Sequence, residues 1–339
     1  MPVESKIRKY KLKEDCISVV DELIKKVDIS PYTQDQLVKT LVSACRSGEA
    51  TIEERKDGLY LIDVDKWFLD RIKPNTVVLS FEDYVASFFR SFRLLVLGNI
   101  AKTDFGGSRQ RDFGQLLTDF TRGFLGEIGI KRFFKQKLNL DVEVEEARIG
   151  TPDEFMARDI VKVKESGNYR DVKAKISVKT SKLGSMWLDV GNQISHSEFF
   201  AFMKIGLTTE HLTTFMKETG FIDSLVKLAV KVKEIKEEDM ESIRDELLSK
   251  IKNFHPIPAY VSGFVEKEKL ENGELITIER RNKKKEVVAR KAVGGLGMFD
   301  KNSADEVEGL GSIKWGKHIA SLGSLNWKQE DWNTIKEKI

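Results

Sequence analysis

The chain has 339 residues, of which 40% are hydrophobic and 33% are charged, the composition of a folded globular protein. Its apolar runs are far too short to cross a bilayer, and charge rather than an apolar run follows the first residues, so we expect neither a membrane span nor a signal peptide. A net charge of only +3 excludes a protein that coats nucleic acid non-specifically, but it permits a DNA enzyme with local basic patches.

The two cysteines argue against a disulfide scaffold and against a zinc site. Cys16 and Cys45 both lie in helical patterns, and neither belongs to a CxxC motif or stands near a histidine pair. This usage is typical of a reducing compartment, so we expect a cytoplasmic protein.

Residues 1–78 predict a small unit with a winged helix-turn-helix pattern. A proline separates two amphipathic helices, a Thr-x-x-Gln capping box opens the second, and a Lys-Asp-Gly turn joins two short strands. These helices and strands are expected at 15–27, 33–46, 51–55 and 59–64.

The second of these helices carries polar side chains that are able to contact base edges or phosphates. They are Gln34, Gln36, Lys39, Ser43 and Arg46. The alternative is a helical packing or dimerisation module that binds protein instead of DNA.

Residues 79–339 predict one larger α/β domain with a mixed central sheet flanked by helices. Helical patterns occupy 81–99, 110–137, 195–205, 209–219 and 221–252. Strand patterns occupy 141–147, 159–163, 173–180, 257–265, 275–280 and 286–292.

Glu127 lies in the middle of an apolar line on the helix expected at 110–137. The line includes Phe120, Phe134 and Leu138, and three glycines near Glu127 would let a ligand or a backbone come close. A carboxylate in such a place is costly to bury unless a cation or a metal ion pairs with it. An unseen Arg or Lys partner is the alternative explanation.

The strands expected at 159–163 and 173–180 are joined by a Ser-Gly-Asn turn. A reversal there sets Asp159 opposite Ile176 or Ser177, and the alternation of side chains puts Ser177 and Lys179 on one face. A carboxylate that holds Mg²⁺ beside a lysine suits phosphodiester hydrolysis. The alternative is a hairpin whose lysines face solvent, and several neighbouring lysines are of that kind.

This order of residues resembles the PD-(D/E)xK nucleases over about residues 115–200: Glu in a long helix, Asp opening a strand, and Ser-Val-Lys in the next strand. Arg158 stands where the proline is expected. Ser177 replaces the second acid, and serine is a weak metal ligand.

One subgroup of type II restriction endonucleases is similar in carrying Ser-x-Lys, and its missing acid is a Glu on a following helix. The helix expected at 195–205 offers Glu198 for that role, with Asp189 in reserve. Ser195-x-x-Glu198 is also a capping box, which explains Glu198 without chemistry.

The resemblance implies a Mg²⁺-dependent type II restriction endonuclease that acts on double-stranded DNA as a homodimer, with a cognate DNA methyltransferase in the same system. Asp159, Glu198 and the carbonyl of Val178 would hold Mg²⁺, Lys179 would orient the attacking water, and Glu127 would support a second metal ion or Lys179. The expected DNA contacts are Gln34, Lys39, Arg46, Ser177 and Lys284.

Three other functions stay open from the sequence. A repair or junction-resolving nuclease would share the same core, although the hairpins after residue 257 favour a sequence reader. A DNA-binding regulator with a decayed nuclease core would explain Ser177. A protein-interaction module would show no salt-sensitive binding to DNA.

Overall fold

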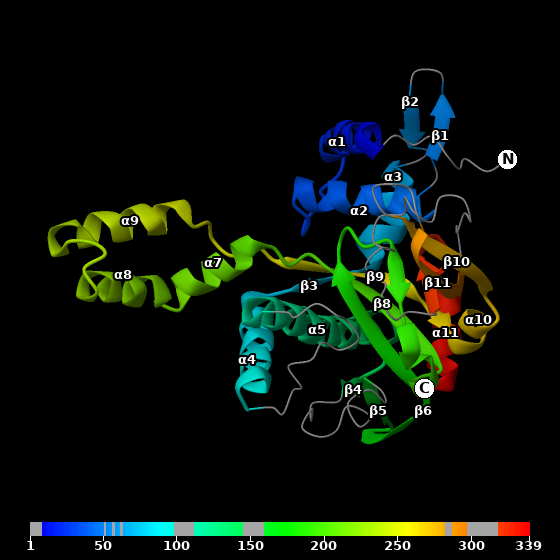
Figure 1. Cartoon of the computed structure of the whole chain (residues 1–339). Coiled ribbons are helices and arrows are strands. Elements are labelled where there is room, and N and C mark those ends of the chain that lie inside the picture. Colours follow the sequence, from blue (N-terminus) through cyan, green and yellow to red (C-terminus); the bar gives the residue numbers. More distant parts are fainter. Residues whose placement is uncertain are drawn as a thin grey trace.

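The computed structural model describes most of the chain (Figure 1). The described residues are 9–50, 52–55, 58–61, 64–97, 112–144, 159–281, 287–296 and 318–339. Lys284, predicted to contact DNA, lies outside these ranges. Within them, no helix has the length and apolar character that a membrane span requires.

Helices surround the sheets. They are α1 (Lys9–Ile24), α2 (Gln34–Arg46), α3 (Val64–Lys66), α4 (Phe81–Leu97), α5 (Phe113–Phe133), α7 (Thr209–Glu218), α8 (Phe221–Lys231), α9 (Met240–Lys250), α10 (Lys267–Glu271) and α11 (Gln329–Lys338), with the short turns η1 (Trp67–Ile72), η3 (Phe134–Leu138), η4 (Gly191–His196) and η5 (Glu237–Asp239).

The strands are β1 (Ile52–Arg55), β2 (Gly58–Leu61), β3 (Thr76–Leu79), β4 (Val142–Val144), β5 (Ile160–Glu165), β6 (Asn168–Lys182), β7 (Trp187–Asp189), β8 (Phe199–Ile205), β9 (Ile257–Glu266), β10 (Glu274–Arg281), β11 (Val287–Leu296) and β12 (His318–Ser321).

In the described ranges, the largest sheet has six strands in the order β3-β9-β8-β6-β5-β4. β6 pairs antiparallel with β5 and parallel with β8, and β9 returns antiparallel to β8. A smaller sheet, β10-β11-β12-β7, lies beside it. The predicted class, α/β with a mixed central sheet and flanking helices, is confirmed at this level.

Helix α5 packs on one face of the six-stranded sheet through its glycines. A Cβ at Gly126 would lie 1.9 Å from Cγ2 of Thr180, and one at Gly129 would lie 2.7 Å from the sulfur of Met203. The two glycines therefore let the helix backbone come close to β6 and β8. Leu125 and Ile130 of α5 and Val172, Ala174 and Ile176 of β6 belong to the main apolar core around this contact.

Two predicted helices are corrected by the structure. The segment expected as a helix at 195–205 ends in β8, whose residues are all buried. A short apolar run fits a fully buried strand as well as a helix, and the Ser195–Glu198 spacing imitated a helix cap. The helix expected at 221–252 is divided into α8 and α9, because Lys233 takes a left-handed backbone conformation with φ 64°.

The N-terminal segment contains the two helices and the hairpin that the sequence predicts, with Arg55 paired to Gly58 across the turn. However, α2 buries two of its five predicted DNA-contacting side chains. Gln36 and Ser43 are buried, since Gln36 donates to the carbonyl of Gly206 (2.7 Å) and Ser43 to that of Leu183 (3.1 Å). The side chains of Gln36 and Ser43 thus bind the ends of β8 and β6. These hydrogen bonds account for two polar residues of the helix without any contact to DNA.

Charged residues are buried where α2 meets the sheet. Lys204 on β8 is fully buried and donates to Ser43 Oγ (2.7 Å). Nearby, Tyr260 Oη donates to Glu49 (2.8 Å), and Arg71 Nε lies 3.6 Å from the same carboxylate oxygen. Burial lowers the pKa of Lys204 to about 8, while the negative charge of Glu49 opposes this shift. The predicted boundary between 1–78 and 79–339 stays a prediction, because these contacts join the two parts closely.

The close packing of α5 predicts opposite effects of alanine at two glycines of the same helix. Gly126→Ala forces its Cβ against Thr180 and should destabilise the protein by about 1–3 kcal/mol. Gly123→Ala meets nothing within 4 Å and should stabilise by about 0.5–1 kcal/mol through helix propensity. Urea unfolding measures both, and equal effects would contradict the packing.

The burial of Lys204 predicts a pH-dependent contribution to stability. Between pH 8 and 10 the unfolded chain keeps this proton and the folded chain loses it, so raising the pH stabilises the wild type relative to Lys204→Met. The slope is at most about 1.4 kcal/mol per pH unit. The measurement is the difference in unfolding free energy between the two proteins at pH 7.5 and 9.5. The same difference at both pH values would contradict the lowered pKa.

Candidate functional site

Asp159 lies immediately before β5 and binds the edge of β6. Its N–H donates to the carbonyl of Ile176 (3.1 Å). Its carboxylate oxygen Oδ2 accepts from Val178 N–H (2.6 Å) and from Ser177 Oγ–H (3.0 Å). The sequence prediction that Asp159 faces Ile176 and Ser177 is therefore confirmed.

The Asp159 carboxylate replaces a strand partner as the hydrogen-bond acceptor at the edge of β6. β5 pairs with β6 only as far as Ile176, so Val178 N–H needs another acceptor. In a strand, the N–H and C=O of one residue point to the same side. The carbonyl of Val178 is thus directed toward the same edge as Asp159.

Lys179 projects from the face of β6 that is opposite α5. Its neighbours Val178 and Thr180 face α5, while Lys179 pairs in register with Phe202, a member of the cluster on the other face. Its ammonium donates to Oε1 of Gln193 in η4. This amide oxygen orients the lysine without neutralising its charge.

Gln193 lies at the candidate site, although no sequence pattern indicates it. It lies in a short 3₁₀ turn between β7 and β8, a segment without a helical or strand period of its own. A polar side chain 14 positions after Lys179 is the only local signal, and only the fold shows that the turn returns to β6.

Glu198 binds the other edge of β6. Its Oε2 accepts from Lys175 N–H (2.7 Å), and its own N–H donates to the Lys175 carbonyl (2.9 Å). Because β6 lies between β8 and β5, Glu198 and Asp159 approach this strand from opposite sides. Glu198 is exposed, and its role as the relocated acid stays a prediction. Asp189, the reserve candidate, is exposed on β7 and pairs in register with Ile319.

Glu127 is buried on α5, with 4% of its surface exposed. The apolar line is buried in its C-terminal half, at Phe134 and Leu138, whereas Phe113 at the start of the helix is half exposed. α5 covers one face of the sheet and Lys179 projects from the other, so the structure does not bring Glu127 and Lys179 onto one face.

The residues expected to contact DNA are spread over the molecule. Gln34 is exposed and donates to Asp21, and Lys39 is exposed and forms an ion pair with Asp35 (2.5 Å). Arg46 is half-buried at the end of α2, and Ser177 is buried with its hydroxyl on Asp159. Contact of these residues with DNA stays a prediction.

The oxygen donors at Asp159 fit a divalent cation only in part. Among the described residues, no group of three or more His, Cys, Asp or Glu side chains is arranged to hold a metal ion. Mg²⁺, however, is commonly held by one or two carboxylates together with substrate phosphates and water. Asp159 and the Val178 carbonyl fit that lighter arrangement, with the DNA supplying further oxygens.

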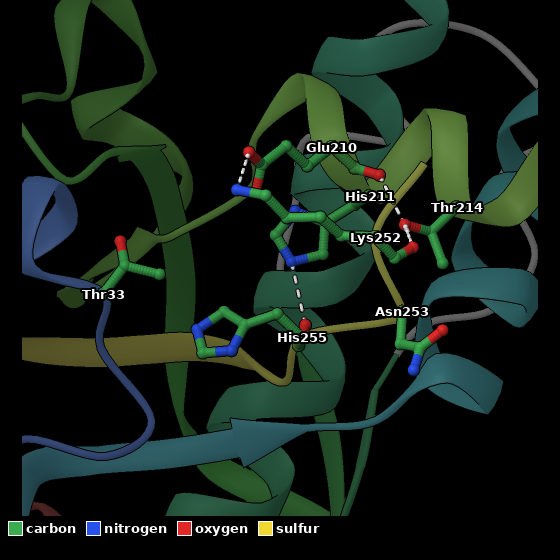
Figure 2. Close-up of a pocket in the computed structure, with 7 residues that line it drawn as sticks. All are labelled: Thr33, Glu210, His211, Thr214, Lys252, Asn253 and His255. Atoms are coloured by element: carbon green, nitrogen blue, oxygen red, sulfur yellow. Dashed lines mark hydrogen bonds and ion pairs between the residues drawn. The ribbon is translucent and has the colours of Figure 1, made fainter. Parts of the chain in front are cut away.

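A small pocket lies elsewhere, where α7 and residues 252–255 meet the start of α2 (Figure 2). His211 is buried there; its Nδ1 accepts from Thr208 N–H (3.0 Å) and its Nε2 faces the carbonyl of His255 (3.0 Å). Burial lowers the pKa of His211, so it is a neutral hydrogen-bonded link at physiological pH. No predicted site residue lines this pocket, whose residues are Thr33, Glu210, His211, Thr214, Lys252, Asn253 and His255.

Comparisons with protein-family models, with curated protein sequences and with solved structures give no significant match.

The hydrogen bonds of Asp159 predict a local structural effect. Asp159→Ala leaves Val178 N–H and Ser177 Oγ without this acceptor and should destabilise by about 1–3 kcal/mol. Asp159→Asn keeps an acceptor of the same shape, so its free energy of unfolding should fall by less than that of Asp159→Ala. Urea unfolding and the exchange rate of the Val178 amide measure both variants. An amide that exchanges equally slowly in Asp159→Ala and the wild type would contradict the assignment.

Proposed function

We propose that the protein is a Mg²⁺-dependent endonuclease that hydrolyses DNA phosphodiester bonds, a type II restriction endonuclease with a cognate methyltransferase in the same system. The observation that supports this most is the carboxylate of Asp159 at the edge of β6, next to Ser177 and one residue from Val178. Lys179 on the same strand adds the cation that phosphate chemistry needs. The helix-strand-strand order around them is the one on which the resemblance to PD-(D/E)xK nucleases rests.

In this proposal Asp159 and the Val178 carbonyl would hold the ion against a DNA phosphate. When bound, Mg²⁺ polarises the phosphate and makes a water molecule a better nucleophile. Asp159 keeps its place because Ser177 and Val178 both donate to it. Ser177 thus acts through Asp159 and does not replace the missing acid as a ligand.

Lys179 would hold the attacking water and stabilise the negative charge that develops on the phosphate. Gln193 limits the positions that the ammonium can take, which lowers the entropy cost of aligning it. Glu198 is the proposed second carboxylate; it is exposed just before β8 and binds the Lys175 amide at the edge of β6 opposite Asp159. Glu127 remains the proposed support for a second ion from the α5 side.

A second candidate is a DNA-binding regulator with an inactive nuclease core. Two observations favour it: serine stands at position 177, and the described residues contain no cluster of three acidic or other metal-binding side chains. Such a protein would bind DNA with a strong dependence on salt but would not cut it.

The test is cleavage of long unmethylated phage DNA with Mg²⁺ by the wild type, Asp159→Asn and Lys179→Met. The proposal predicts discrete fragments from the wild type and a loss of roughly hundredfold or more in both variants. Glu198→Gln shows a comparable loss if Glu198 is the second carboxylate. Lys162→Met is the matched control, because Lys162 is half exposed on β5 and pairs with Glu143 (3.8 Å).

A smear of fragments would contradict the sequence-specific part of the proposal and indicate a repair or non-specific nuclease. Intact DNA over several divalent metals and temperatures, with DNA binding retained, would overturn the enzyme and favour the regulator.

A further inference from the structure

The segment 207–256 forms a helical arm that extends from the rest of the molecule (Figure 1). Its root is α7, which packs on α4 through ring contacts of Phe215 with Tyr84 and Phe88. Among the described elements, α8 packs mainly on α7 and α9, and α9 mainly on α8 and the adjacent turn η5. The arm is therefore held to the rest of the molecule mainly through its root.

His211 joins the two chain segments that form the root of the arm (Figure 2). It is the third residue of α7, and its side chain is buried. Its Nδ1 accepts from the N–H of Thr208, the residue that caps α7 (3.0 Å). Nε2 therefore carries the ring proton and donates to the carbonyl of His255, in the segment that returns from the arm (3.0 Å). The imidazole thus connects the start of the arm to its end.

These contacts fit the neutral imidazole of His211 better than the charged imidazolium. A proton on Nδ1 would deprive Thr208 N–H of its acceptor, whereas the Thr208 hydroxyl, 2.8 Å from Nδ1, can pair with either form. A positive charge in the first turn is also unfavourable, because the N-terminus is the positive end of the dipole of α7. The ring contacts Tyr84 and Phe254, at centroid distances of 6.4 and 5.3 Å, where a charge is costly to bury. Burial accordingly lowers the pKa of His211 below its ordinary value of about 6.5.

The titratable groups around this ring do not offset the cost of charging it. On α7, the carboxylate of Glu210 favours a positive charge, but it already pairs with Lys252 of the returning segment (2.9 Å). His255, with its ring centroid 6.5 Å away, opposes a second positive charge. On α4, Tyr84 stays neutral because burial raises its pKa to about 12. Thr33, at the start of α2, lines the same pocket and carries no charge.

We propose that His211 is a pH-sensitive switch of the arm: protonation of its imidazole loosens the root, so that α7, α8 and α9 open from α4 in mildly acidic solution and close again near neutrality. The closed root favours the neutral ring, and the open root lets water hydrate the charged ring. The equilibrium therefore shifts toward the open arm as the pH falls below the ordinary pKa of histidine, about 6.5, and is constant above it. This inference concerns the arm alone and does not rest on the proposed nuclease activity.

The test is hydrogen exchange of the full chain, measured as the protection factors of the Thr208 amide and of the α7 amides at about pH 7.5 and about pH 5.5. Protection factors are corrected for the effect of pH on intrinsic exchange, so they report the opening of the root. In the wild type they should fall about tenfold at the lower pH, which lies one unit below the ordinary pKa of histidine. Nitrogen NMR of the histidine rings should show His211 as the neutral Nε2–H tautomer while the root is closed.

Two variants assign the effect to one histidine. His211→Gln can still accept and donate but gains no proton in this range, so its protection factors should be equal at the two pH values. His255→Gln is the matched control, because it removes the neighbouring ring and keeps the backbone carbonyl that binds His211, so it should keep the tenfold loss.

Three results would overturn the proposal. They are equal protection of α7 at both pH values in the wild type, the same loss in His211→Gln as in the wild type, and a charged His211 in a root that keeps its protection. The first and the third are measured on the wild type alone, so they decide the question even if the His211→Gln root does not form.

Discussion

The edge of β6 beyond Ile176 is the constraint on which the candidate site depends. β6 has 15 residues and continues past the point where β5 stops pairing with it, so the backbone of Val178 requires a partner on that side. Asp159 supplies it, since its carboxylate accepts from Val178 N–H and from Ser177 Oγ–H. One carboxylate therefore supplies, at this edge, the hydrogen-bond acceptor that β5 no longer provides.

The two faces of β6 serve different purposes. Even-numbered residues such as Thr180 meet the glycines of α5 in the main core, and odd-numbered residues carry the polar groups. Lys179 on the second face meets Gln193, and Lys204 on β8 lies farther along the same face, buried against α2. Helix α2 thus covers one end of the sheet face that carries Lys179. The packing of α2 and the proposed site share this face.

The strand pair around Asp159 was predictable because its signals are local. A glycine turn sets where the chain reverses, which brings Asp159 to the correct part of β6. The exact neighbours, Ser177 and Val178, depend on a register shift between Ile160 and Lys162 that the sequence does not show. The burial of Glu127 also followed from the apolar line of its helix.

Other features depend on contacts distant in sequence and could not be predicted in this way. Phe199–Ile205 is a strand at the centre of the six-stranded sheet. Both faces of such a strand are buried, so its residues are all apolar or buried and do not alternate between apolar and polar. Gln36 and Ser43 looked like exposed polar residues, but their partners, Gly206 and Leu183, are more than 130 positions away. Gln193 is only 14 positions after Lys179, but their contact depends on the chain returning to β6 through η4.

The most direct test of the central claim is the effect of Ca²⁺, which supports binding without rapid cleavage in many Mg²⁺ sites, on the affinity for unmethylated phage DNA fragments. If Asp159 holds a divalent ion against a DNA phosphate, Ca²⁺ should tighten binding by about tenfold in the wild type and leave Asp159→Asn unchanged. An equal gain in both proteins, or no gain in the wild type, would contradict a metal site at the edge of β6.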